Sequence, residues 1–143
     1  MPSDQSGRPF TSIGDTGDLY GRPELPFVPA IRVPAGCDLI FVSGALGAPK
    51  AGDEEMDLRA ETRRCFENLA AVLALSDAGL ADVVSITKLL VDIERDNETI
   101  VAVLNEFFPD HLPTSTTFEV ARLVPPDLRI EINAIAAVRP ADR

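Results

Sequence analysis

Two amphipathic helical patterns, separated by a single β-rich segment, are the feature that most constrains the fold of this 143-residue chain. The first spans residues 57–79, with Asp57 as N-cap and Gly79 as C-terminal stop. Its apolar positions recur at helical spacing on one face: Leu58, Cys65, Leu69, Val72 and Leu73. The second begins near residue 94, with Asp96 or Asn97 as cap, and ends before Pro109. Its core positions are Ile100, Val103, Leu104 and Phe107.

Five β-rich runs surround these helices. The first two, residues 27–33 and 38–46, are separated by Pro-Ala-Gly-Cys and predict a hairpin. The other runs are residues 82–93, 116–123 and 128–138. The resulting order, β-β-α-β-α-β-β, predicts an α+β fold in which both helices cover one face of a mixed sheet. The strands carry too many apolar residues for the other face to lie in water, so we expect a homo-oligomer that buries it.

Residues 1–25 are rich in Gly, Pro, Ser and Asp and show no periodicity. We interpret them as an irregular N-terminal arm, and residues 26–143 as a single domain. The arm is either a disordered tail or an ordered segment that packs on a neighbouring subunit through a few apolar anchors. Those anchors are Phe10, Ile13, Leu19 and Tyr20.

Charge and composition exclude several classes of function. The formal charge is −10, which disfavours nucleic acid and anionic lipid as partners. No basic start precedes an apolar run, and no apolar stretch is long enough to span a membrane. Cys37 and Cys65 are far apart, which fits a reducing cytoplasm, and Cys65 lies on an apolar helix face as a packing residue. The only histidine, His111, suits a solvated helix end better than a metal site or a catalytic triad.

Four segments together resemble the YjgF/RidA (Rid) family. They are FVSGALG, CFENLAAVLALSDAGLADVVSITKLLVDI, VLNEFFPDHLPTSTTFEVARL and RIEINAIA, and the resemblance runs from about residue 27 to residue 139. It implies a chorismate-mutase-like α+β fold, assembled as a trimeric barrel with ligand clefts between subunits. It also implies hydrolysis of reactive imines or enamines to 2-keto acids and ammonia, without a metal or organic cofactor.

The resemblance also assigns site residues. Glu131 matches the last-strand glutamate that orients the attacking water, and is the expected catalytic residue; a polar strand residue paired with an arginine is the alternative. Ser43 and Gly44 match the Ser-Gly pair of the second strand, and Ala45 follows them. Phe27 stands where the family has a tyrosine, and Val101 where it often has an asparagine.

The largest departure from the family pattern lies at Ser115. The family's Pro-x-Arg-Ser reads Pro-Thr-Ser-Thr here, so Ser115 replaces the arginine that holds a substrate carboxylate. We expect Ser115, Thr116 and Thr117 to line a hydroxyl-rich pocket, with ordinary strand residues as the alternative. Loss of that fork weakens carboxylate binding by about ten- to a hundredfold, unless Arg122 or Arg129 replaces it.

Three functions remain open at this point. The first is a Rid-like hydrolase or deaminase that acts on an imine or enamine with altered specificity. The second is a non-catalytic trimer that binds a small metabolite. The third is a pathway-specific catalyst that uses the same intersubunit cleft. A nuclease role is disfavoured by the acidic charge.

Overall fold

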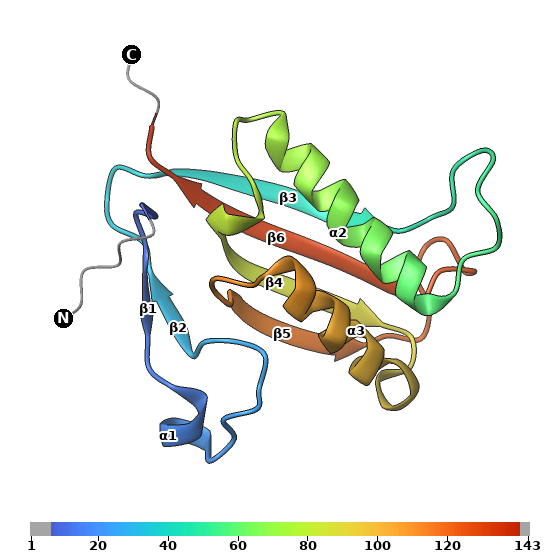
Figure 1. The fold of residues 1–143 in the computed structure, drawn as a ribbon, viewed down its shortest axis with the longest axis horizontal. Helices are drawn as coiled ribbons and strands as arrows, with labels where there is room; N and C mark the ends of the chain where they lie inside the picture. Colours follow the sequence, from blue (N-terminus) through green and yellow to red (C-terminus); the bar gives the residue numbers. More distant parts are fainter. Residues whose placement is uncertain (1–6, 141–143) are drawn as a thin grey trace.

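A four-stranded mixed sheet with two helices on one face forms the body of the molecule (Figure 1). The computed structural model describes residues 7–140. The strands lie in the order β3 (Asp38–Leu46), β6 (Ile130–Val138), β4 (Val83–Leu90) and β5 (Thr114–Glu119). β6 is antiparallel to both of its neighbours, and β5 is parallel to β4. This arrangement confirms the predicted α+β class.

The two main helices are α2 (Leu58–Ala74) and α3 (Ile93–Phe107). Asp57 caps α2 as predicted, because its side chain accepts a hydrogen bond from Ala60 N (2.8 Å). The predicted cap of α3 is wrong. Asp92 caps this helix through Arg95 N (3.0 Å), whereas Asp96 lies inside it as a buried, ion-paired residue.

The predicted hairpin between the first two β-rich runs is also wrong. β2 (Ala30–Arg32) pairs with β1 (Thr11–Ile13) in a separate two-stranded ribbon, and β3 pairs only with β6. Prolines at positions 29 and 34 lack an amide donor. They therefore leave β2 three residues long, which is too short to pair along the nine residues of β3.

The segment expected to be irregular contains ordered elements. Besides β1, it forms the short helix α1 (Thr16–Tyr20), capped by the side chain of Asp15 and by Gly21 in the left-handed conformation (φ 65°). Phe10 is buried against Val84 and Ala137, on the sheet face opposite the two main helices. Phe10 therefore anchors this segment on its own chain, whereas the other expected anchors, Ile13, Leu19 and Tyr20, remain exposed.

His111 reinforces this packing and is not the solvated residue that the sequence suggested. Its ring lies between Phe10 and Phe108, with centroid distances of 5.7 Å to each. Its Nε2–H donates to Val83 O at 2.9 Å. Burial lowers the pKa of the imidazole, so the neutral ring is favoured in this setting.

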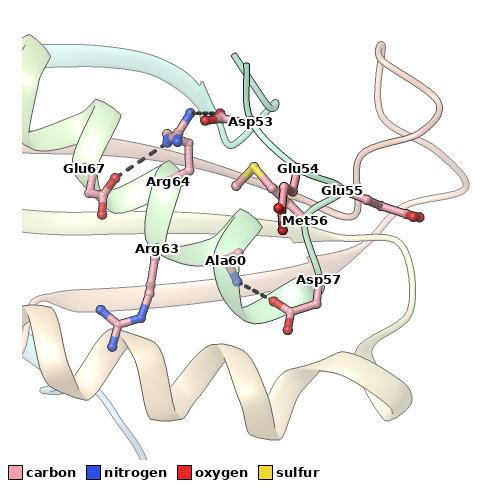
Figure 2. A pocket seen from close by; sticks show the side chains of 9 residues that line it. All are labelled: Asp53, Glu54, Glu55, Met56, Asp57, Ala60, Arg63, Arg64 and Glu67. Carbon is pink, nitrogen blue, oxygen red and sulfur yellow. Dashed lines mark hydrogen bonds and ion pairs between the residues drawn. The ribbon is translucent and has the colours of Figure 1, made fainter. Parts of the chain in front are cut away.

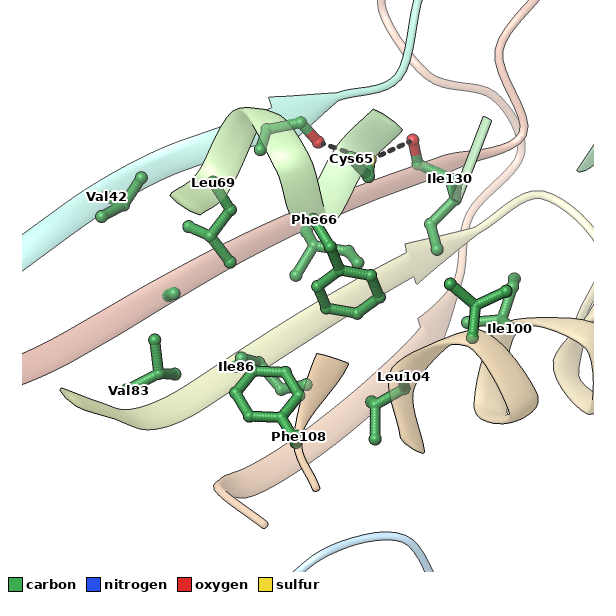
Figure 3. Packing of buried hydrophobic residues seen from close by; sticks show 14 of the residues in the cluster. Val42, Cys65, Phe66, Leu69, Val83, Ile86, Ile100, Leu104, Phe108 and Ile130 are labelled. Carbon is green, nitrogen blue, oxygen red and sulfur yellow. Dashed lines mark hydrogen bonds between the residues drawn. The ribbon is translucent and has the colours of Figure 1, made fainter. Parts of the chain in front are cut away.

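The hydrophobic core fills the space between the helices and the sheet (Figure 3). Phe66 and Leu69 of α2 and Leu104 of α3 are fully buried there above Ile86 and Ile132. Cys65 is fully buried too, and its thiol donates to Ala45 O (3.1 Å). Burial raises the pKa of this thiol to about 12, which confirms Cys65 as a packing residue.

The opposite sheet face is only partly covered by the arm. Leu39, Phe41 and Phe118 point away from the helices and remain 50%, 72% and 53% exposed. A single copy of the chain therefore leaves a broad apolar surface in water, which is the situation expected of an oligomer interface.

Candidate functional site

A hollow of about 360 Å³ lies between α3, the parallel strands β4 and β5, and the loop before β2. Its walls are formed by Leu25, Pro26, Phe27, Lys88, Ile93, Asn97, Val101, Ser115, Thr116 and Thr117. Five predicted ligand-binding residues thus lie together here: Phe27, Val101, Ser115, Thr116 and Thr117. We call this hollow the β5 pocket.

Regular structure places these side chains. Ile93, Asn97 and Val101 recur every four residues, so one stripe of α3 faces the pocket. Ser115 and Thr117 lie on alternate positions of β5, in register with Ile86 and Lys88 of β4 on the helix-covered face. Val28 N–H donates to Pro113 O (3.3 Å), which ties the loop that carries Phe27 to the start of β5.

Lys88 is the one charged residue among the described residues that line the pocket, and sequence reasoning missed it. It shares a strand face with Ile86 and Leu90, which both belong to the core. The signal was present in the sequence, because period-two alternation along this run places Lys88 among interior positions. It was overlooked because the run was interpreted only as a strand.

Glu131 lies on the other face of the sheet. It is paired across the ladder with Leu46 and Leu89. Its side chain covers Gly44: a Cβ at position 44 would lie 2.5 Å from Glu131 Cδ, so only glycine leaves this carboxylate in place. Ser43 is exposed beside Gly44, whereas the side chain of Ala45 is buried in the core.

The predicted residues therefore form two groups within one chain. One group lines the β5 pocket, and the other, around Glu131 and Gly44, lies on the face opposite the helices. Neither arginine considered as a replacement for the family arginine lines the pocket. Arg129 is bound to Asp96 through Nη2–Oδ1 (2.5 Å), and Arg122 is exposed beyond the end of β5.

A second hollow lies beside the first turns of α2 (Figure 2). Carboxylates from Asp53 to Glu67 line it, together with Arg63 and Arg64. Arg64 pairs with Asp53 (3.0 Å) and with Glu67 (3.6 Å), so its charge is already matched within the chain. None of the predicted site residues lines this hollow, and we do not regard it as the candidate site.

Within residues 7–140, no group of three or more His, Cys, Asp or Glu side chains is arranged to hold a metal ion. In the same range, no helix has both the length and the apolar character needed to cross a bilayer.

These features define a small α+β protein with a ligand-sized pocket at the parallel edge of its sheet and a carboxylate held over a glycine on the opposite face. The family model described as endoribonuclease L-PSP matches residues 21–138, and the chain belongs to this family, which includes YjgF and RidA. The resemblance found in the sequence is thereby confirmed.

Three relatives illustrate the range of the family. The 2-iminobutanoate/2-iminopropanoate deaminase of Escherichia coli K12 is 34% identical over 106 residues, which cover 71% of this chain and 81% of that protein. The structure of a Rid family protein from Yersinia pestis has a TM-score of 0.78 at 25% identity and covers 91% of this chain and 99% of that one. Escherichia coli TdcF, solved with bound serine, has a TM-score of 0.64 at 31% identity, and the match covers 80% of this chain and 89% of that one.

Proposed function

We propose that this protein is a Rid-like hydrolase of the cytoplasm that converts a reactive imine or enamine to a carbonyl compound and ammonia. Family membership and the deaminase relative support this reaction class. The observation that carries the proposal is Glu131, whose carboxylate lies directly over Gly44 on the sheet face opposite the helices.

In this mechanism Glu131 orients a water molecule toward the imine carbon. As the water oxygen forms a bond to that carbon, the π electron pair of the C=N bond passes to nitrogen, which takes up the proton that water loses. Transfer of the remaining hydroxyl proton to the amino nitrogen then accompanies cleavage of the C–N bond, so that ammonia leaves and the carbonyl forms. Water is the only co-reactant, so the step requires no oxidant or reductant.

The active assembly in this proposal is a homotrimer with its clefts between subunits. The exposed Phe41, Leu39 and Phe118 support burial of the open sheet face against other copies. Assembly also offers a route for the Glu131 group of one subunit to meet the β5 pocket of the next.

Specificity differs from that of a 2-imino acid deaminase because Ser115 offers a hydroxyl where the family has an arginine. A hydroxyl cannot form a bidentate, charge-assisted pair with a carboxylate. We therefore expect a preference for an imine or enamine whose binding does not depend on that pair.

The test measures ammonia release from 2-iminobutanoate, generated in situ by a threonine dehydratase, and from neutral imines of similar size. The Glu131→Gln variant retains the shape of the side chain but loses its charge, and we expect its rate to fall by at least a hundredfold. Glu98→Gln, an exposed substitution on α3, is the matched control and should keep the wild-type rate.

A second candidate, a trimer that binds a small metabolite without turnover, is favoured by the same Ser115 substitution. It predicts thermal stabilisation by ligands such as 2-oxobutanoate without ammonia release from any imine. Steady product formation that depends on Glu131 would exclude it, whereas equal background rates for wild type and Glu131→Gln would contradict the hydrolase proposal.

A further inference from the structure

Lys88 occupies a position where lysine is rarely found. It lies between Ile86 and Leu90 on the helix-covered face of β4, and only 2% of its surface is exposed. Lysine is among the residues least often buried in this way, because its ammonium loses hydration. A buried lysine therefore requires either a charged partner or a functional reason.

The structure offers Lys88 no opposite charge. Among the described residues, no carboxylate is within ion-pair distance of its amine and no hydrogen-bond acceptor contacts it. Every other residue that lines the β5 pocket is uncharged, including Asn97 of α3 and Ser115–Thr117 of β5. The buried acidic residue of α3, Asp96, is occupied by Arg95 and Arg129.

The amine nevertheless has access to the pocket. Lys88 contributes to the wall of this open hollow. Its nitrogen has no partner among the described residues, yet it is not completely sealed from solvent. A small molecule that enters this pocket would therefore meet a single nitrogen nucleophile among apolar and hydroxyl-bearing side chains.

Desolvation alone lowers the pKa of Lys88 to about 8. At pH 7, roughly one amine in ten is then neutral, against about one in three thousand for an ordinary lysine. A desolvated lysine in an apolar pocket is a recognised way to prepare an amine for attack on a carbonyl carbon.

We propose that Lys88 is a nucleophilic amine that forms a covalent imine with a short-chain aldehyde or ketone bound in the β5 pocket. The amine nitrogen forms a bond to the carbonyl carbon, the π electron pair passes to oxygen, and one amine proton moves to that oxygen to give a carbinolamine. The second amine proton then goes to the hydroxyl, which leaves as water while the C=N bond forms. No oxidant or reductant takes part.

The pocket suits such a ligand. About 360 Å³ accommodates a compound of a few carbon atoms, and the apolar side chains of Leu25, Phe27 and Val101 contact its chain. The hydroxyls of Ser115 and Thr117 lie on the same strand face as Lys88, where they can hydrogen-bond the carbinolamine oxygen. This step differs from the one proposed for Glu131, because the attacking group is the Lys88 amine and not a water molecule.

Reductive trapping tests this proposal. The chain has two lysines, Lys50 and Lys88, so the exposed Lys50 is an internal control. The full-length protein is incubated at pH 7 with 2-oxobutanoate or butanal and cyanoborohydride, and peptides are mapped by mass spectrometry. We expect at least tenfold more reduced adduct on Lys88 than on Lys50 with at least one of the two probes.

Two variants sharpen the result. Lys88→Arg keeps a positive charge but cannot form this imine, and should lose the adduct, whereas Lys50→Arg should keep the adduct at Lys88. Comparable or lower labelling of Lys88 than of Lys50 with both probes overturns the proposal. Trapping needs no turnover, so Glu131→Gln should retain it, and failure of the hydrolase proposal can be told apart from failure of this one.

Discussion

The uncompensated amine of Lys88 lowers the stability of the folded chain at neutral pH. Its pKa falls from an ordinary lysine value to about 8 on folding, so the unfolded chain binds the extra proton more tightly. The penalty is complete below about pH 8 and disappears as pH rises through the unfolded pKa near 10.5. A residue that costs stability in this way is most easily explained by its use in the pocket.

We therefore expect Lys88→Met to raise the free energy of unfolding at pH 7 by on the order of 2–3 kcal/mol. The gain should shrink steadily between pH 8 and pH 10. Chemical denaturation at fixed protein concentration measures it at each pH. Lys50→Met, on the surface, should leave the free energy of unfolding within about 0.5 kcal/mol of wild type throughout. A Lys88→Met variant less stable than wild type at pH 7 would contradict this reasoning.

At the scale of single residues, the sequence predicted several residues of the β5 pocket but not Lys88. Phe27, Val101 and Ser115 were assigned from motif position alone, and they line one pocket. Lys88 was not found: alternation along its strand places it at an interior position, but no local pattern shows that its amine has no partner there. The ion pair between Arg129 and Asp96 could not be predicted either, because the two residues are 33 positions apart in the sequence.

At the scale of elements, Asp96 joins the first turns of α3 to the start of β6. Its carboxylate is fully buried and accepts hydrogen bonds from Arg95 Nε (2.7 Å) and Arg129 Nη2 (2.5 Å). The hydrogen bond from Arg95, and then that from Arg129, lowers the pKa of this carboxyl. It therefore stabilises the fold at pH values above its ordinary pKa, and this stabilisation is lost as pH falls through the lowered value.

We expect Asp96→Asn to reduce the free energy of unfolding at pH 7 by about 1–3 kcal/mol, because a neutral amide cannot balance two guanidinium groups. The difference from wild type should vanish in strong acid, where Asp96 is protonated in both states. Denaturation midpoints measured from pH 7 downward check this. Asp77→Asn, an exposed substitution after α2, should behave as wild type, and a pH-independent loss in Asp96→Asn would count against the ionic explanation.

The elements themselves were predicted where the signal is local. α2 and α3 follow from apolar spacing and β4 from its β-branched residues, and all three lie close to the expected ranges. The predicted pairing of β2 with β3 was wrong. Their actual partners, β1 and β6, are set by competition between whole strands and not by the local turn signal. Pro29 and Pro34 are visible in the sequence. Their effect on the length of β2 can be inferred only when the strand that pairs with β2 is known.

For the whole molecule, the open sheet face makes the clearest prediction. Phe41 is 72% exposed at a position where the strand faces away from both main helices. If the chain assembles as a trimer through this face, Phe41→Glu places three charges in the interface and should shift the population to monomers by at least tenfold in dissociation constant. Sedimentation equilibrium over a range of concentrations measures this shift.

Leu75→Glu is the matched control. Leu75 is 86% exposed, yet it lies at the end of α2 on the helix side of the molecule. It should keep the wild-type association state. A wild-type protein that remains monomeric at all concentrations, or equal effects of the two substitutions, would show that the open face is not the assembly surface.

The order of strands in the sheet also governs how the chain can fold as it is made. β6 lies between β3 and β4, yet it is the last strand to be synthesised. Until it leaves the ribosome, β3 has no strand to pair with, and the apolar residues of β3 and α2 have no completed sheet beneath them. Nascent chains should therefore hold these segments exposed until β6 has been made, which makes chaperone binding and translation rate important for the yield of folded protein.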